Sequence, residues 1–183
     1  MSVDGITGSG RALITRLLAA LCIGFALGAC DTSDPASAQD NPYDPPESDL
    51  SDEETKAQVV APAVAVVRAV TLDDVTGGFS FGSCNDQGRP PFQGRVEVAF
   101  KLPADPEAVY GRIRDALVAQ GWAAGEPEGQ VMHGDSLNRD GVTASVGPRV
   151  ADPGYGALEL YGQCRNMGDH GSQGPIDITD QLR

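Results

Sequence analysis

The side chains that could do chemistry in this sequence are few: two histidines, four cysteines and one serine in a suggestive setting. Ser136 lies in the stretch HGDSLNRDG, and a serine nucleophile needs a histidine base that is oriented by a third group. The histidines, His133 and His170, are 37 residues apart, and neither belongs to a metal-ligand pattern. We therefore predict that both histidines lie in solvent-exposed loops, and we predict no metal and no cofactor.

Residues 134–137, Gly-Asp-Ser-Leu, resemble the signature of the GDSL hydrolases. That resemblance would imply a doubly wound α/β enzyme with the signature at its first strand and a late Asp-x-x-His pair. Here only 46 residues follow the tetrapeptide, and the residue three before His170 is Met167. We interpret Ser136 as a strand-end residue beside the turn signal Asp140-Gly141. A serine hydrolase that uses Ser136 and His170 is kept as an alternative function.

Cys30 has the setting of a lipid attachment site. Two arginines precede the apolar run 17–29, which is shorter than the about 20 residues of a membrane-spanning helix and is typical of an export signal. Leu27-Gly28-Ala29-Cys30 resembles the lipobox of bacterial lipoproteins, which implies cleavage before Cys30 and a diacylglyceryl thioether on its sulfur. An ordinary secretion signal or a retained anchor is the alternative. Two acyl chains hold a protein to a bilayer almost permanently, so we predict a signal peptide at 1–29 and a location on the outer face of the cytoplasmic membrane.

Residues 30–50 follow as an acylated cysteine and a tether. They are rich in Asp, Ser and Pro and nearly lack aliphatic side chains, so they cannot bury enough surface to offset the entropy of ordering. The formal net charge of the chain is -13, and the segment 31–54 holds nine acidic residues and no basic one. Phosphate recognition requires clustered Lys and Arg, so nucleic acid is excluded as a partner.

Cys84 and Cys164 are the cysteines of the predicted domain. Exported proteins typically pair such cysteines, so we predict one disulfide. Strand alternation over 157–164 turns Cys164 inward, but over 78–84 it turns Cys84 outward unless Gly82 bulges or the strand ends first. A reactive thiol or a metal pair is the alternative, and only one histidine lies near enough in sequence to join it.

The first helix is predicted over 51–70. Ser51 and Glu54 fit a capping box at its start. Pro62 predicts a kink, and the many valines leave a strand open as the alternative for 59–70.

The second helix is predicted over 105–120. Asp105 is a suitable N-cap, and a proline follows at the first helical position. Gly121 can adopt the left-handed conformation that ends a helix, after which Trp122 folds back on Leu117. We therefore expect Trp122 in the core and not in a ligand site.

Alternation of apolar and polar side chains predicts strands at 78–84, 95–102, 141–147 and 157–164. The order helix, strand, strand, helix and further strands favours an antiparallel sheet with helices on one face. We predict an α+β domain of two layers over 51–164, with four to six antiparallel strands, two helices on one face and one disulfide. Residues 165–183 are predicted as a C-terminal tail, with order or disorder left open.

The layout resembles that of the LppA-like group of small actinobacterial cell-envelope lipoproteins. The elements that carry the resemblance are Cys30, the spacer 31–50, the helix 51–70, Cys84, the strand 95–102, the helix 105–120 and Gly162-Gln163-Cys164. The resemblance implies an envelope location and this architecture, and it implies no catalytic residues.

From these features we expect a non-enzymatic binding or interaction module of the bacterial cell envelope. Its predicted partners are the membrane, through the lipid on Cys30, and an unknown envelope protein or small ligand. The alternatives are the small extracytoplasmic serine hydrolase and a solute-binding component of a transporter.

Overall fold

The structure of the protein is a computed structural model that describes residues 48–85, 87–125 and 135–183. The predicted signal peptide, Cys30, most of the predicted tether and His133 lie outside the described residues. Within the described ranges, no helix is long and apolar enough to cross a membrane.

Helix α1 (Asp52–Ala69) begins at the predicted capping box. The Ser51 hydroxyl accepts a hydrogen bond from the Glu54 backbone N–H, and the Glu54 carboxylate accepts one from the Ser51 backbone N–H. The helix continues through Pro62, so the strand alternative for 59–70 is wrong. One face of the helix is buried, formed by Thr55, Val59, Val60, Pro62, Ala63 and Val66.

Helix α2 (Pro106–Ala119) confirms the predicted start and end signals. The Asp105 carboxylate accepts a hydrogen bond from Ala108 N at 3.4 Å, as an N-cap does. Gly121 has a φ of 88°, and the Trp122 N–H then donates to Leu117 O at 3.1 Å. Trp122 is buried in the core, as predicted.

In the part of the chain that the structure describes, seven strands form one antiparallel sheet in the order β3-β4-β5-β6-β2-β1-β7. They are β1 (Asp73–Ser83), β2 (Phe92–Lys101), β3 (Ala123–Ala124), β4 (Asp135–Arg139), β5 (Val142–Pro148), β6 (Tyr155–Tyr161) and β7 (Ile176–Asp177). The count exceeds the predicted four to six because β3 and β7 have two residues each, too few to show alternation. Strand β1 begins at Asp73, before the predicted start at residue 78. Alternation did not predict these first residues because the register shifts between Asp73 and Thr76.

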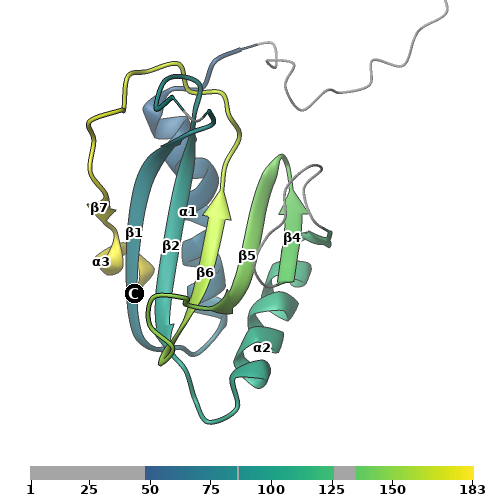
Figure 1. Ribbon diagram of the computed structural model, residues 1–183. Coiled ribbons are helices and arrows are strands. Elements are labelled where there is room, and N and C mark those ends of the chain that lie inside the picture. The colour runs from purple at the N-terminus through teal and green to yellow at the C-terminus, as the bar shows by residue number, and fades with distance from the viewer. Residues whose placement is uncertain (1–47, 86, 126–134) are drawn as a thin grey trace, which may run out of the picture. The chain divides into compact units, whose positions relative to one another are not determined.

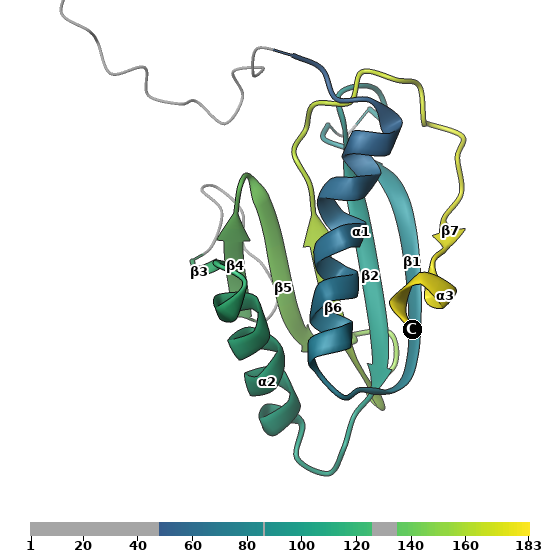
Figure 2. The same cartoon turned by 180° about the vertical axis from the view of Figure 1, so that it is seen from behind.

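The helices cover one face of this sheet. Both α1 and α2 lie behind the sheet in Figure 1 and in front of it in Figure 2. The α+β class with two layers is therefore confirmed. The largest buried side chains between the layers include Phe79, Val96, Phe100, Ile113, Leu117, Leu158 and Leu160.

Gly94 of β2 lies directly beneath helix α1. A Cβ built on Gly94 would lie 2.5 Å from the Thr55 backbone oxygen of α1. The absence of a side chain at residue 94 is therefore what allows α1 to lie directly on β2.

The C-terminal segment packs on the domain and does not trail free. Cys84 and Cys164 form the predicted disulfide, and β1 ends at Ser83, so Cys84 lies beyond the strand and its alternation does not apply. After the disulfide the chain returns to add β7 and the short helix α3 (Thr179–Leu182), shown in yellow in Figure 1. Ile178 and Leu182 are each 1% exposed, so this segment completes the core beside β1.

Candidate functional site

His170 is a core side chain, which corrects the prediction of an exposed loop histidine. It is 4% exposed, and its ring stacks on Phe81 with 3.6 Å between the ring centroids. Its Nε2 lies 3.0 Å from both the Asn166 Oδ1 and the Asp52 Oδ1. The disulfide at Cys164 ties the start of the C-terminal segment to Cys84. The contact of His170 with Asp52 then joins this segment to the start of α1.

Ser136 is placed far from His170. It lies in β4 and pairs with Ser145 of β5, on the sheet face that the helices leave open. His170 instead contacts Phe81 of β1 and Phe92 of β2, which face the helices. Three strand spacings of about 4.8 Å separate β4 from β2, so the two side chains are not brought together.

Metal binding has no candidate among the residues that the structure describes. No group of three or more His, Cys, Asp or Glu side chains in them is arranged to hold an ion. His133 lies outside these residues, and both cysteines within them are in the disulfide.

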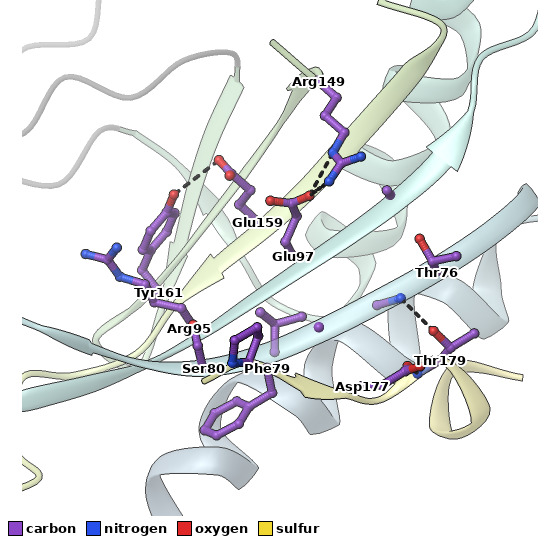
Figure 3. A pocket seen from close by; sticks show the side chains of 15 residues that line it. Thr76, Phe79, Ser80, Arg95, Glu97, Arg149, Glu159, Tyr161, Asp177 and Thr179 are labelled. Carbon is purple, nitrogen blue, oxygen red and sulfur yellow. Dashed lines mark hydrogen bonds and ion pairs between the residues drawn. The ribbon is translucent and has the colours of Figure 1, made fainter. Parts of the chain in front are cut away.

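The open face of the sheet carries a hollow of about 570 Å³, which we call the trough (Figure 3). No helix of the described chain covers this face (Figure 1). The floor of the trough is made of small residues, which are Thr76, Gly78 and Ser80 of β1 and Ala99 of β2. One wall is formed by Arg95, Glu97, Arg149, Glu159 and Tyr161, and the other by Pro175, Asp177 and Thr179.

Gly78 is the reason that the floor is low. Its register partners are Glu97 on one side and Asp177 on the other, so the two carboxylate residues flank a position without a side chain. A Cβ built on Gly78 would meet no atom within 4 Å. A glycine inside a strand weakens the strand, and it commonly marks a place where another molecule or chain approaches the backbone.

Two carboxylates face each other in the first wall. Glu97 of β2 and Glu159 of β6 are direct cross-strand partners, and like charges in that position destabilise a sheet. Arg149 offsets the repulsion, because its Nε and one terminal nitrogen each lie 2.8 Å from Glu97 Oε1. The pair is partly exposed, so its net stabilisation is small.

Tyr161 holds the second carboxylate of this wall. Its hydroxyl donates a hydrogen bond to Glu159 Oε2 at 3.1 Å, and the Arg95 guanidinium lies 5.5 Å from its ring centroid. Burial and the charge of Glu159 raise the pKa of Tyr161 to about 12. The phenol is therefore neutral and a hydrogen-bond donor at physiological pH.

The second wall is held in place by backbone bonds. The Thr179 N–H donates to the Asp177 carboxylate at 2.8 Å, and this bond lowers the pKa of Asp177. The Gly77 N–H donates to the Thr179 hydroxyl at 3.0 Å. Asp177 is thus a fixed, ionised acceptor at the edge of the trough.

The trough offers hydrogen-bonding groups to a polar ligand. Its side chains are carboxylates, guanidinium groups and hydroxyls, and Ser136 and His170 are not among its lining residues. Apolar and polar residues alternate over 95–102, which places Arg95 and Glu97 on the polar face of that strand, but nothing in the sequence marks Gly78 or Asp177 as site residues. Strand register alone brings these residues together.

Comparison with known proteins identifies relatives of this chain. The family model described as "Putative lipoprotein LppJ" matches residues 51–181. Two proteins of that name are similar along nearly the whole chain. The one from Mycobacterium tuberculosis (strain ATCC 25618 / H37Rv) is 42% identical over 181 residues, covering 96% of each chain. The one from Mycobacterium bovis (strain ATCC BAA-935 / AF2122/97) is 42% identical over 173 residues, covering 94% of this chain and 91% of its own.

No solved structure matches the chain. The relatives are mycobacterial, which confirms the prediction of a small actinobacterial lipoprotein, although the family differs from the LppA-like group that the layout resembles. The chain belongs to the LppJ lipoprotein family.

Proposed function

We propose that the protein is a lipid-anchored binding module on the outer face of the cytoplasmic membrane, and that its ligand occupies the trough. The lipobox at Leu27-Gly28-Ala29-Cys30 supports the anchor, and so does membership of a lipoprotein family. Cleavage before Cys30 leaves the spacer 31–50 between the lipid and the domain.

The observation that carries the binding role is the unfilled floor over Gly78. Glu97 and Asp177, the residues beside it in the sheet, both have carboxylate side chains. Residue 78 has no side chain, and a Cβ built on it would meet no atom within 4 Å. The hollow is ringed by charged groups held by their neighbours, as Glu97 is by Arg149. In concave ligand sites, polar groups that are held in position fix the orientation of the ligand.

A binding role without catalysis also agrees with the placement of the serine and the histidine. Ser136 lies on the open face and His170 in the core, so His170 is not available as the base for that serine. The Ser136 hydroxyl is buried and has no hydrogen-bond partner among the described residues. A nucleophile needs a proton acceptor within hydrogen-bond distance.

The anchor is tested by mass spectrometry of the chain purified from its own membrane. We expect the N-terminal peptide to begin at Cys30 and to carry diacylglycerol. A Cys30→Ser variant should leave the membrane fraction. A full-length, unmodified N-terminus in the purified protein would contradict the anchor.

The binding role is tested by co-sedimentation of the acylated chain, held in lipid nanodiscs, with washed cell walls of a mycobacterium. We expect the Gly78→Leu variant to lose co-sedimentation, because leucine places a bulky side chain on the floor of the trough, where a built Cβ meets no atom within 4 Å. The control is Gly111→Leu on α2, where the nearest atom to an added Cβ is 3.8 Å away. Equal co-sedimentation of both variants and the parent protein would contradict the proposal.

A further inference from the structure

We propose that the ligand of the trough is a neutral, polyhydroxylated chain, that is, a stretch of carbohydrate. This inference rests on the proposed function and names the chemical class of its ligand. It follows from the charges, the hydrogen-bonding groups and the shape of the trough.

The charges of the trough are mixed and nearly balanced. Three carboxylates line it, Glu97, Glu159 and Asp177, against two guanidinium groups, Arg95 and Arg149. Arg149 is already paired with Glu97. The trough therefore has no strong net charge with which to select an anion or a cation, which favours a neutral ligand.

The hydrogen-bonding groups call for a ligand that both donates and accepts. The carboxylates accept only, and the guanidinium groups donate only. Glu159 uses one oxygen for the Tyr161 hydroxyl, and Arg95 lies over the ring of Tyr161 with its fork of N–H donors. A hydroxyl group of a ligand can donate a hydrogen bond to Glu159 and accept one from Arg95. Neighbouring hydroxyls of a sugar match such bidentate groups, and hydrogen bonds to charged groups are the stronger kind.

The shape of the trough favours a chain over a compact molecule. It extends from Tyr161 of β6 across β2 and β1 to Asp177 of β7, which is three strand spacings or about 14 Å. Its small floor residues let a ligand lie against the backbone of β1.

The test compares hexasaccharides that differ in charge, using the acylated full chain in nanodiscs and calorimetry or a glycan array. One matched set is the N-acetylglucosamine hexamer, which is neutral, its de-N-acetylated cationic form and the galacturonic acid hexamer, which is anionic. Neutral hexamers of arabinose, galactose and glucose cover other stereochemistries. We expect at least one neutral hexamer to bind about tenfold or more tightly than both charged ones.

Variants then assign the binding to the trough. Gly78→Leu should abolish it, and Glu159→Gln should weaken it about tenfold or more, since a hydrogen bond to a charged group is lost. Glu159→Gln also removes the repulsion of Glu97, so the melting temperature should not fall. Gly111→Leu and Glu53→Gln, both on the helix layer, should bind as the parent protein does.

Three results would overturn the inference: no neutral hexamer binds, a charged hexamer binds as tightly as the neutral ones, or Gly78→Leu leaves the binding unchanged. Its failure is separable from that of the proposed function. If cell walls still co-sediment with the parent protein and not with Gly78→Leu while every neutral hexamer fails, the binding face stands and carbohydrate is wrong. If co-sedimentation is also independent of Gly78, both are wrong.

Discussion

Removal of the Cys84–Cys164 disulfide should destabilise the domain strongly. The bridge closes a loop with a sequence separation of 80 residues. In the chain-entropy model a crosslink that closes a loop of this length stabilises the folded domain by about 4.5 kcal/mol, because it restricts the unfolded chain. That is a large part of the 5–15 kcal/mol that a domain typically has. The bridge also fixes the start of the segment that carries His170 and α3, so its loss frees a part of the core.

The measurement is urea unfolding of the Cys84→Ala/Cys164→Ala double variant against the parent protein. We expect the free energy of unfolding to fall by about 4 kcal/mol and the melting temperature by roughly 15 °C. A reducing agent should produce the same shift in the parent protein and none in the variant. A loss below about 1 kcal/mol would contradict a stabilising role of the disulfide, since it would mean that packing alone holds the two ends of the loop together.

Three further changes test other parts of the structure. Tyr161→Phe should remove the component near pH 12 from an ultraviolet titration of the tyrosines. Because the pKa of Tyr161 in the fold is above the ordinary value near 10, its contribution to stability is present below pH 10 and is lost as the pH rises toward 12. An unchanged titration curve would show that another tyrosine ionises there. Gly94→Ala should cost about 1–3 kcal/mol in unfolding experiments, because the added Cβ would lie 2.5 Å from the Thr55 oxygen, and an unchanged stability would contradict this close contact. Ser136→Ala should change the stability by less than about 0.5 kcal/mol, because the buried hydroxyl has no hydrogen bond to lose within the described chain, whereas a loss above 1 kcal/mol would reveal one.

The elements that the sequence predicts well are those with local signals. Helix α2 has an N-cap and a proline at its start and a glycine at its end, and all three act within a few residues. The outward direction of Arg95 and Glu97 follows from alternation within β2 alone. Such features depend on backbone chemistry near the residue and not on the rest of the fold.

The features that escaped prediction depend on contacts between distant segments. His170 is buried because the disulfide returns its segment to Phe81 and to the start of α1, and nothing beside His170 in the sequence indicates this. The like-charged pair of Glu97 and Glu159 exists only in the register of β2 with β6. Gly78 lies in a glycine-rich stretch, and only the low floor of the trough gives it a role.

Hydroxyl-radical footprinting of the acylated chain with washed cell walls shows whether the ligand lies on the open sheet face. Tyr161 lies in the trough, whereas Val118 of α2 is exposed on the helix layer and serves as the reference. We expect cell walls to lower the oxidation of Tyr161 and to leave that of Val118 unchanged. Protection of Val118 with Tyr161 unprotected would place the ligand on the opposite face of the domain, and a ligand in the trough would then be wrong.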